Sequence, residues 1–263
     1  MRGQIFLDFI SLLAPYAGNV LSFPLVNPSV IPWDFALILA FLGLIIPWRG
    51  AVRMKSLLRK PELTTGDRLA LYGSTIIFQW LIVAVVAWRC RARMLGFAEL
   101  GLTTADPWRI VWSGIALTAL LCVNQVFGLR KMASLPVGKR GSLFAITEKI
   151  MPRTSMELLV FAGLACTAGI SEEFLYRGFV FGVLLRIFAK FAGANVIAVA
   201  LSSVWFSATH WYQGRRGLIT TCVVGIIFAV VRIWTRSLVP VMVAHAGIDL
   251  VAGIFVSRFL RRA

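Results

Sequence analysis

Residues 156–188 read MELLVFAGLACTAGISEEFLYRGFVFGVLLRIF, an apolar run long enough to cross a lipid bilayer, since a membrane-spanning helix needs roughly 20 apolar residues. Three charged side chains, Glu172, Glu173 and Arg177, stand together in the middle of this run. Ionisable groups inside a bilayer are costly, so they normally face one another or a cavity and mark function. The stretch therefore predicts a membrane helix that carries a functional site.

The composition of the whole chain agrees with this interpretation. Of its 263 residues, 59% are hydrophobic and 14% are charged, and the mean hydropathy is +0.84. Soluble domains contain about 45–50% apolar and about 25% charged residues. Because backbone polar groups must be satisfied internally in lipid, we expect an all-α, polytopic membrane helical bundle.

Seven further apolar blocks accompany residues 156–188. They cover residues 4–23, 33–48, 69–88, 109–128, 195–211, 217–233 and 238–258. The block at 33–48, bracketed by Pro32 and Pro47, and the block at 217–233 are short for a span. Asp8 and Pro15 interrupt the first block, which could instead lie in the membrane interface. We therefore predict eight transmembrane helices, or seven if the first block does not span.

The distribution of ionisable residues divides the chain into two parts. Residues 154–258 carry the intramembrane charges and both histidines, and we expect them to form a catalytic membrane domain. Residues 1–153 contribute N-terminal membrane spans with basic loops and suggest no function of their own. Apart from Asn124 and Gln125, these N-terminal spans look nearly free of polar groups.

Lys and Arg residues orient the predicted spans. With the N-terminus placed in the cytoplasm and Arg177 set aside, 18 of them fall on the cytoplasmic side and 8 on the other. A cytoplasmic excess is the usual bias, although the cluster at residues 89–93 opposes it. Short basic loops without a soluble extension favour a multi-pass integral protein of a bacterial inner membrane.

The net charge of +16 does not indicate nucleic-acid binding. No basic stripe interleaved with aromatic residues lies on a polar segment, as single-stranded nucleic acids would require. The positive charges flank apolar spans, where they meet anionic lipid head groups. The four cysteines, Cys90, Cys122, Cys166 and Cys222, lack metal-type spacing and are expected to be core residues without disulfides.

The acidic motif allows two interpretations. On a helix Glu173 and Arg177 are i,i+4 neighbours, so an ion pair is within reach. Glu172 is turned away by about 100° and is free to face another cavity as a base. Alternatively, the three charges only hold helices together and perform no chemistry.

The only two histidines of the chain strengthen the chemical interpretation. His210 follows Phe206 by one helical turn at the end of one block, and His245 precedes Asp249 by one turn in the last block. Each pair shares a helix face. We expect Glu172, His210 and His245 to converge on one cavity, with Asp249 beside His245.

These motifs, taken in order, resemble the CPBP family. Glu172-Glu173-x-x-x-Arg177, Phe206-x-x-x-His210 and His245-x-x-x-Asp249 are similar to the motifs of the type II CAAX prenyl proteases and the bacteriocin-processing or immunity-associated membrane proteins, also called the Abi family. The resemblance covers about residues 154–258. It implies an intramembrane endopeptidase whose substrate is a membrane-associated protein or peptide.

The resemblance also implies roles for single residues. Glu172 matches the general base that activates water together with His210, and His245 with Asp249 matches the group that stabilises the oxyanion. Glu173 and Arg177 match the supporting pair, with Phe206 as the aromatic residue before the first histidine. These roles agree with general acid–base and oxyanion chemistry.

Asp249 departs from the family pattern, which has Asn in its best-studied members. An ionised carboxylate cannot donate a hydrogen bond, so three roles stay open: a protonated acid, a partner that orients His245, or a metal ligand. Glu172, His210, His245 and Asp249 would form an acceptable zinc set, but the compact His-Glu-x-x-His spacing is missing. We expect either no cofactor or a divalent metal on these four residues, with the metal-free site slightly favoured.

Two other functions compete with the protease. A non-catalytic scaffold or immunity protein of the same fold would need none of the titratable residues. An ion or proton transporter would use the same buried charges, but it would need polar residues along a whole path. Prenylated CAAX proteins are eukaryotic, so for a bacterial protein we expect a different substrate.

Overall fold

The computed structural model describes residues 31–104, 106–136 and 141–259, and within these ranges it is helical and contains no strand. The predicted all-α membrane bundle is thereby confirmed. The first apolar block, residues 4–23 with Asp8 and Pro15, lies outside the described residues.

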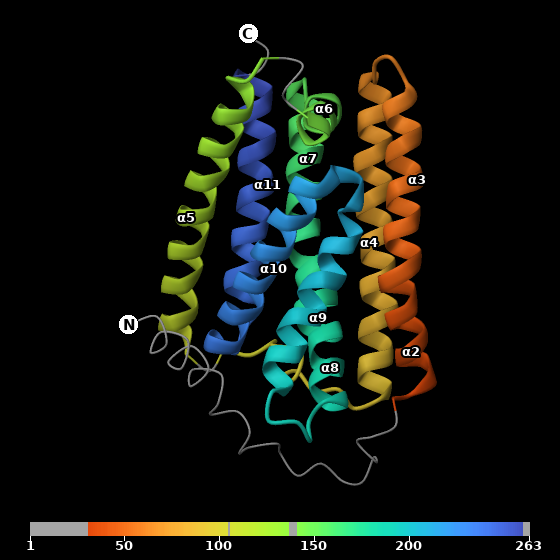
Figure 1. The fold of residues 1–263 in the computed structure, drawn as a ribbon, viewed down its shortest axis with the longest axis vertical. Coiled ribbons are helices and arrows are strands. Elements are labelled where there is room, and N and C mark those ends of the chain that lie inside the picture. Colours follow the sequence, from red (N-terminus) through yellow and green to blue (C-terminus); the bar gives the residue numbers. More distant parts are fainter. Residues whose placement is uncertain (1–30, 105, 137–140, 260–263) are drawn as a thin grey trace.

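Each of the other apolar blocks is helical, and Figure 1 shows the helices running roughly along one axis. In chain order the elements are α2 (Trp33–Ala40), η2 (Phe41–Ile45), α3 (Ile46–Arg59), α4 (Thr65–Ala92), α5 (Pro107–Ala133), α6 (Gly141–Ile150), α7 (Ser155–Glu173), η4 (Phe174–Val180), α8 (Phe181–Ile187), α9 (Ala194–Thr209), η5 (Trp211–Gln213), α10 (Gly214–Thr235) and α11 (Val239–Phe259). The short helix α6 lies in a stretch that the sequence suggested only as a basic loop.

Polar residues at the helix starts explain where several spans begin. The Thr64 hydroxyl accepts from the Asp67 backbone N–H at 3.1 Å, and the Asp67 carboxylate accepts from the Thr64 N–H at 3.0 Å. This capping box satisfies two N–H groups that a helix start leaves free. Asp106 caps α5 and Thr154 caps α7 through their side-chain oxygens.

Five helical stretches in the described ranges are long and apolar enough to cross a membrane, including Trp33–Arg59 and Trp211–Thr235. The expectation that blocks 33–48 and 217–233 are short was therefore wrong. Pro47 does not end its span, because the helix passes through it directly after the π-helical segment η2. In contrast, α9 has only 16 residues and ends at Thr209.

Helix α7 and its continuation through η4 and α8 occupy the centre of the bundle. Helices α4 and α11 pack against α7, α5 packs against α11, and α9 pairs with α10. Figure 1 shows the turn between α9 and α10 stopping short of the end where α3 and α4 are joined. His210 follows α9 directly and is therefore placed inside the bundle.

Helix α4 is fixed near both ends by ion pairs with buried carboxylates. Near its start Arg68 binds Glu157 of α7 at 2.9 Å, and near its end Arg89 and Arg93 both bind the buried Asp34 of α2. The description of the N-terminal spans as nearly free of polar groups was therefore wrong. The pairing with Asp34 also gives two arginines of the 89–93 cluster a structural partner.

Candidate active site

Glu173 is the centre of the polar cluster. One carboxylate oxygen, Oε1, accepts from Arg177 Nη1 at 3.0 Å and from His245 Nδ1 at 2.7 Å. The side chains of Glu173 and Arg177 are completely buried. The predicted i,i+4 ion pair is confirmed, but the sequence did not predict that the same carboxylate also holds His245.

Close packing of α7 against α11 brings Glu173 to His245. One turn before Glu173, a Cβ atom on Gly169 would lie 2.7 Å from the Met242 carbonyl oxygen and 2.8 Å from the Ala246 backbone nitrogen. Only glycine allows the two backbones to approach this closely. Directly after Glu173 the helix becomes π-helical in η4, a distortion that is frequent at functional sites.

The contact with Glu173 sets the orientation of the His245 ring. A carboxylate only accepts hydrogen bonds, so Nδ1 carries a proton and donates a hydrogen bond to Glu173. The other nitrogen, Nε2, then lies 3.9 Å from Glu172 Oε2 and 3.8 Å from Asp249 Oδ2. The His245 ring therefore has the buried carboxylate of Glu173 at Nδ1 and the carboxylates of Glu172 and Asp249 near Nε2.

Glu172 points to a different partner from Glu173, as their helical positions predict. Its Oε1 accepts from Gln79 Nε2 of α4 at 2.9 Å, and its side chain is about one-fifth exposed. The motifs did not reveal Gln79. Its only signal in the sequence was its type, because it is the single side-chain amide in the apolar block 69–88.

His210 joins the cluster from the end of α9. Its Nδ1 lies 3.2 Å from the Phe206 carbonyl oxygen, and its ring centroid lies 4.8 Å from that of Phe206. The Phe206 ring also lies 6.1 Å from the His245 ring, so Phe206 stands between the two histidines. With Nδ1 held by the backbone, Nε2 of His210 is the nitrogen available for chemistry.

Aromatic rings surround the Arg177 guanidinium. Its carbon lies 4.0 Å from the Phe206 ring centroid and 5.4 Å from that of Phe228. Cation–π contacts of this kind stabilise a desolvated guanidinium. Phe206 thus supports both Arg177 and His210, and Phe228 of α10 is a supporting residue that the sequence motifs did not reveal.

Several buried polar atoms of this cluster have no hydrogen-bond partner. Within the described residues they include Oε2 of Glu172, Oε2 of Glu173, Oε1 of Gln79, and Nε and Nη2 of Arg177. Most buried polar atoms in proteins are paired, so a group of unpaired ones needs an explanation. A site that must bind water or a peptide group would leave such atoms free.

The four residues considered for zinc do not form a ligand set in this arrangement. Nowhere in the described ranges are three or more His, Cys, Asp or Glu side chains grouped so that they could hold a metal ion. Zinc needs nitrogen and oxygen ligands at about 2.0–2.2 Å from the ion. Nδ1 of His245 is engaged by Glu173, so Nε2 is the nitrogen of this residue that could bind a metal. All four cysteines are free.

Comparison with known proteins supports the family assigned from the motifs. Residues 154–251, less than half of the chain, match the family model of the type II CAAX prenyl endopeptidases, Rce1-like. No curated protein and no solved structure matches the chain. The match supports an intramembrane endopeptidase at the level of the family, in a chain whose apolar helices make it an integral membrane protein. Gln79, which binds Glu172, lies outside the matched range.

Proposed function

We propose that this protein is an intramembrane endopeptidase that hydrolyses a peptide bond in a membrane-associated protein or peptide. The observation that carries the proposal is the convergence of Glu172, His245 and Asp249, with His210 across the Phe206 ring. The family match over residues 154–251 supports the same conclusion. Short basic loops support a bacterial plasma membrane as its location, in which case the substrate carries no prenylated CAAX sequence.

Glu172 is the base in the proposed reaction. It removes a proton from a water molecule held beside Nε2 of His210, and the resulting hydroxide adds to the peptide carbonyl carbon. Protonated Glu172 then returns the proton to the leaving amine as the carbon–nitrogen bond breaks. A positioned acid–base group of this type contributes typically 10²–10⁴-fold to a rate. The proposed reaction steps require no metal.

His245 stabilises the negative charge that develops on the carbonyl oxygen. With Nδ1 donating to Glu173, a proton on Nε2 would point away from Glu173 to the side of Glu172 and Asp249. Asp249, whose side chain is about 40% exposed, is placed to accept from Nε2 before substrate binds. Donors fixed in advance around a developing oxyanion are among the largest contributions to catalysis.

The test uses the full-length protein reconstituted in liposomes with a pool of membrane-anchored peptides, and mass spectrometry of new peptide termini. Wild-type protein should cleave a subset of the peptides, with or without a chelator, and Glu172→Gln should not. Glu62→Gln is the matched control, because Glu62 is an exposed carboxylate in the loop between α3 and α4. Equal cleavage by Glu172→Gln and wild type would reject the proposal and favour a scaffold of the same fold.

A further inference from the structure

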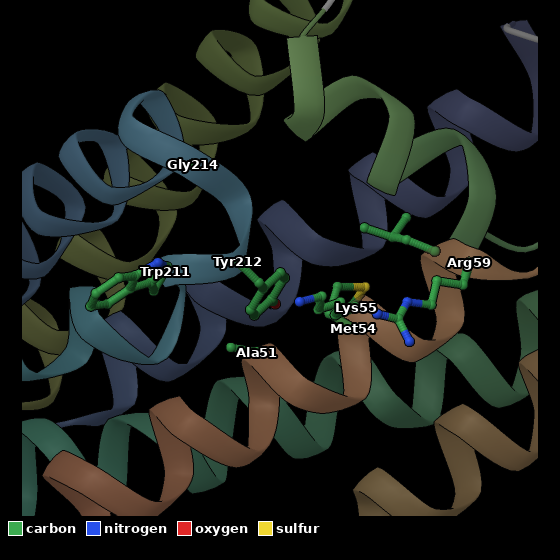
Figure 2. A pocket seen from close by; sticks show the side chains of 8 residues that line it. Ala51, Met54, Lys55, Arg59, Trp211, Tyr212 and Gly214 are labelled. Atoms are coloured by element: carbon green, nitrogen blue, oxygen red, sulfur yellow. The ribbon is translucent and has the colours of Figure 1, made fainter.

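A pocket beside the proposed active site is lined by basic and aromatic side chains. It has a volume of about 520 Å³ and lies between α3 and the turn that joins α9 to α10. Figure 2 shows Lys55 reaching from α3 toward the ring of Tyr212, with Arg59 farther along the same helix and Trp211 on the opposite side. The pocket lining therefore includes aromatic rings and cations, and among the described residues no acidic side chain lines it.

The two cations of the pocket differ from their neighbours on α3 and at the start of α4. Lys60 is paired with Asp67 at 2.6 Å, and Arg53 donates to the Ser74 hydroxyl at 2.6 Å. Lys55 and Arg59 are one helical turn apart, exposed, and without a side-chain partner among the described residues. Two like charges one turn apart repel each other slightly, so an anion between them would be stabilising.

Tyr212 connects the pocket to the proposed catalytic residues. Its ring is stacked on that of His210, with centroids 6.2 Å apart and an interplanar angle of 29°. A chain bound in the pocket would therefore lie against the ring that stacks on His210, one of the proposed catalytic residues.

We propose that this pocket binds a carboxylate of the peptide substrate, with Lys55 and Arg59 as its cationic partners. The carboxylate belongs to an acidic side chain near the scissile bond or to the end of the substrate chain. The rings of Trp211 and Tyr212 hold the backbone that leads from the carboxylate to the active site. This inference rests on the proposed function and deepens it, because it names anionic peptides as the substrate class.

Anionic lipid head groups are the other common partners of exposed cations at a membrane surface. Apart from Lys55 and Arg59, no basic residue in the described ranges lines this pocket. Lys55 and Arg59 differ from the other basic residues because the pocket that they line also contains Tyr212, whose ring stacks on that of His210. A lipid head group in this position would obstruct the proposed path of the peptide, so the location favours the substrate itself.

The test measures binding and cleavage separately, on full-length protein in liposomes of phosphatidylcholine alone and with added phosphatidylglycerol. The probes are fluorescent membrane-anchored peptides that differ only in Glu, Gln or Lys at one position, each with a free or an amidated terminus. The pocket variant is Lys55→Glu with Arg59→Glu. The matched control is Arg130→Glu with Lys131→Glu, which makes the same charge change at the exposed end of α5.

Wild-type protein and the control should bind the Glu peptide, or the free-acid peptide, about threefold to tenfold more tightly than its neutral counterpart, as expected for two exposed ion pairs. The pocket variant should lose this preference and favour Lys. A preference for the Glu peptide over the Gln peptide identifies a side-chain carboxylate. A preference for the free-acid peptide over the amidated peptide identifies the terminal carboxylate. Binding preference without cleavage would support the pocket and reject the proposed function. Cleavage with the same preference in the pocket variant, or a loss seen only with phosphatidylglycerol, would overturn the inference.

Discussion

The Arg68–Glu157 pair and the Glu173–Arg177 pair are both buried salt bridges anchored on α7, yet they are built differently. Arg68 donates to both oxygens of Glu157, at 2.9 and 3.0 Å, and its third nitrogen, Nη1, donates to the Leu63 carbonyl oxygen at 2.7 Å. The carboxylate receives a further bond from the Arg153 backbone N–H. In this pair, every side-chain nitrogen and oxygen has a partner.

The Glu173–Arg177 pair leaves three of its five side-chain polar atoms without a hydrogen-bond partner among the described residues. Only one bond joins the two side chains, and Oε2 of Glu173 and two nitrogens of Arg177 have no hydrogen-bond partner among the described residues. Unpaired buried polar atoms cost free energy, so a purely structural pair should resemble Arg68–Glu157. We infer from this difference that the first pair stabilises the fold, whereas the second also serves the chemistry that we propose for Glu172 and His245.

The largest effect should follow loss of the catalytic groups. Glu172→Ala and His210→Ala should each lower the cleavage rate by about 10²–10⁴-fold, with little change in the thermal unfolding of the purified protein. Neither residue belongs to the Arg68–Glu157 pair or the Glu173–Arg177 pair. Cleavage rates per folded molecule and melting curves measure the two effects separately. Cleavage at the wild-type rate in either variant would contradict the assignment.

The next largest effects are expected when either arginine of the two buried pairs is replaced. Arg68→Ala and Arg177→Ala each leave a buried carboxylate without its partner, a loss of about 3–5 kcal/mol in buried pairs generally. Both variants should therefore unfold at lower temperature. Per folded molecule, only Arg177→Ala should lose cleavage, because Glu173 also holds His245. Equal loss of cleavage in both variants would remove the distinction between the two pairs.

Replacing both members of the structural pair sharpens the same distinction. Apolar replacements of both partners in a buried ion pair are often neutral or stabilising. Arg68→Met combined with Glu157→Leu should therefore recover most of the stability that Arg68→Ala loses, and it should keep cleavage. Melting curves and cleavage rates of the single and double variants provide the measurement. A double variant that is folded but inactive would show that this pair also serves the reaction.

A smaller effect is expected at Gln79, which lies on α4 outside the family match. Gln79→Leu removes one hydrogen bond to Glu172, and a single bond is worth about 0.5–1.5 kcal/mol. The kcat should fall roughly twofold to tenfold with KM unchanged, since the bond orients the base and not the substrate. Gln125→Leu, the same change in α5, is the control and should leave both constants unchanged.

The smallest change is expected for Asp249→Asn. If Asp249 accepts from His245 or assists the oxyanion, an amide can replace it, so cleavage should be retained or should rise. A metal ligand would behave differently, because the amide and a chelator would then both lower cleavage. Cleavage rates of wild type and variant, each with and without the chelator, separate these two roles.

The sequence predicted those features that repeat along one helix or follow from composition. The apolar blocks predicted the helices, and i,i+4 spacing predicted the contact between Glu173 and Arg177. The contacts that organise the site join residues far apart in the chain, such as Gln79 with Glu172 and Glu173 with His245. Helix packing creates these contacts, so spacing within one block cannot reveal them.

Departures from regular helices were also hidden from the sequence. Phe41–Ile45 is apolar throughout, and Phe174–Val180 is apolar except for Tyr176 and Arg177, yet nothing in either pattern marks the π-helical turns that the structure has there. Tyr176 of η4 donates to the Leu42 carbonyl oxygen of η2 at 3.3 Å, so the two segments contact each other. This contact joins residues that are distant in sequence, so the pattern within one apolar block does not reveal it.

The most direct test of the central claim compares cells that carry wild-type protein with cells that carry Glu172→Ala at the same level. Mass spectrometry of peptide termini in their membranes would reveal every cleavage that depends on this carboxylate. We predict a set of membrane-protein termini that is present with the wild type and absent with Glu172→Ala. Identical sets of termini in the two membranes would contradict the assignment of Glu172 as the base of an intramembrane endopeptidase.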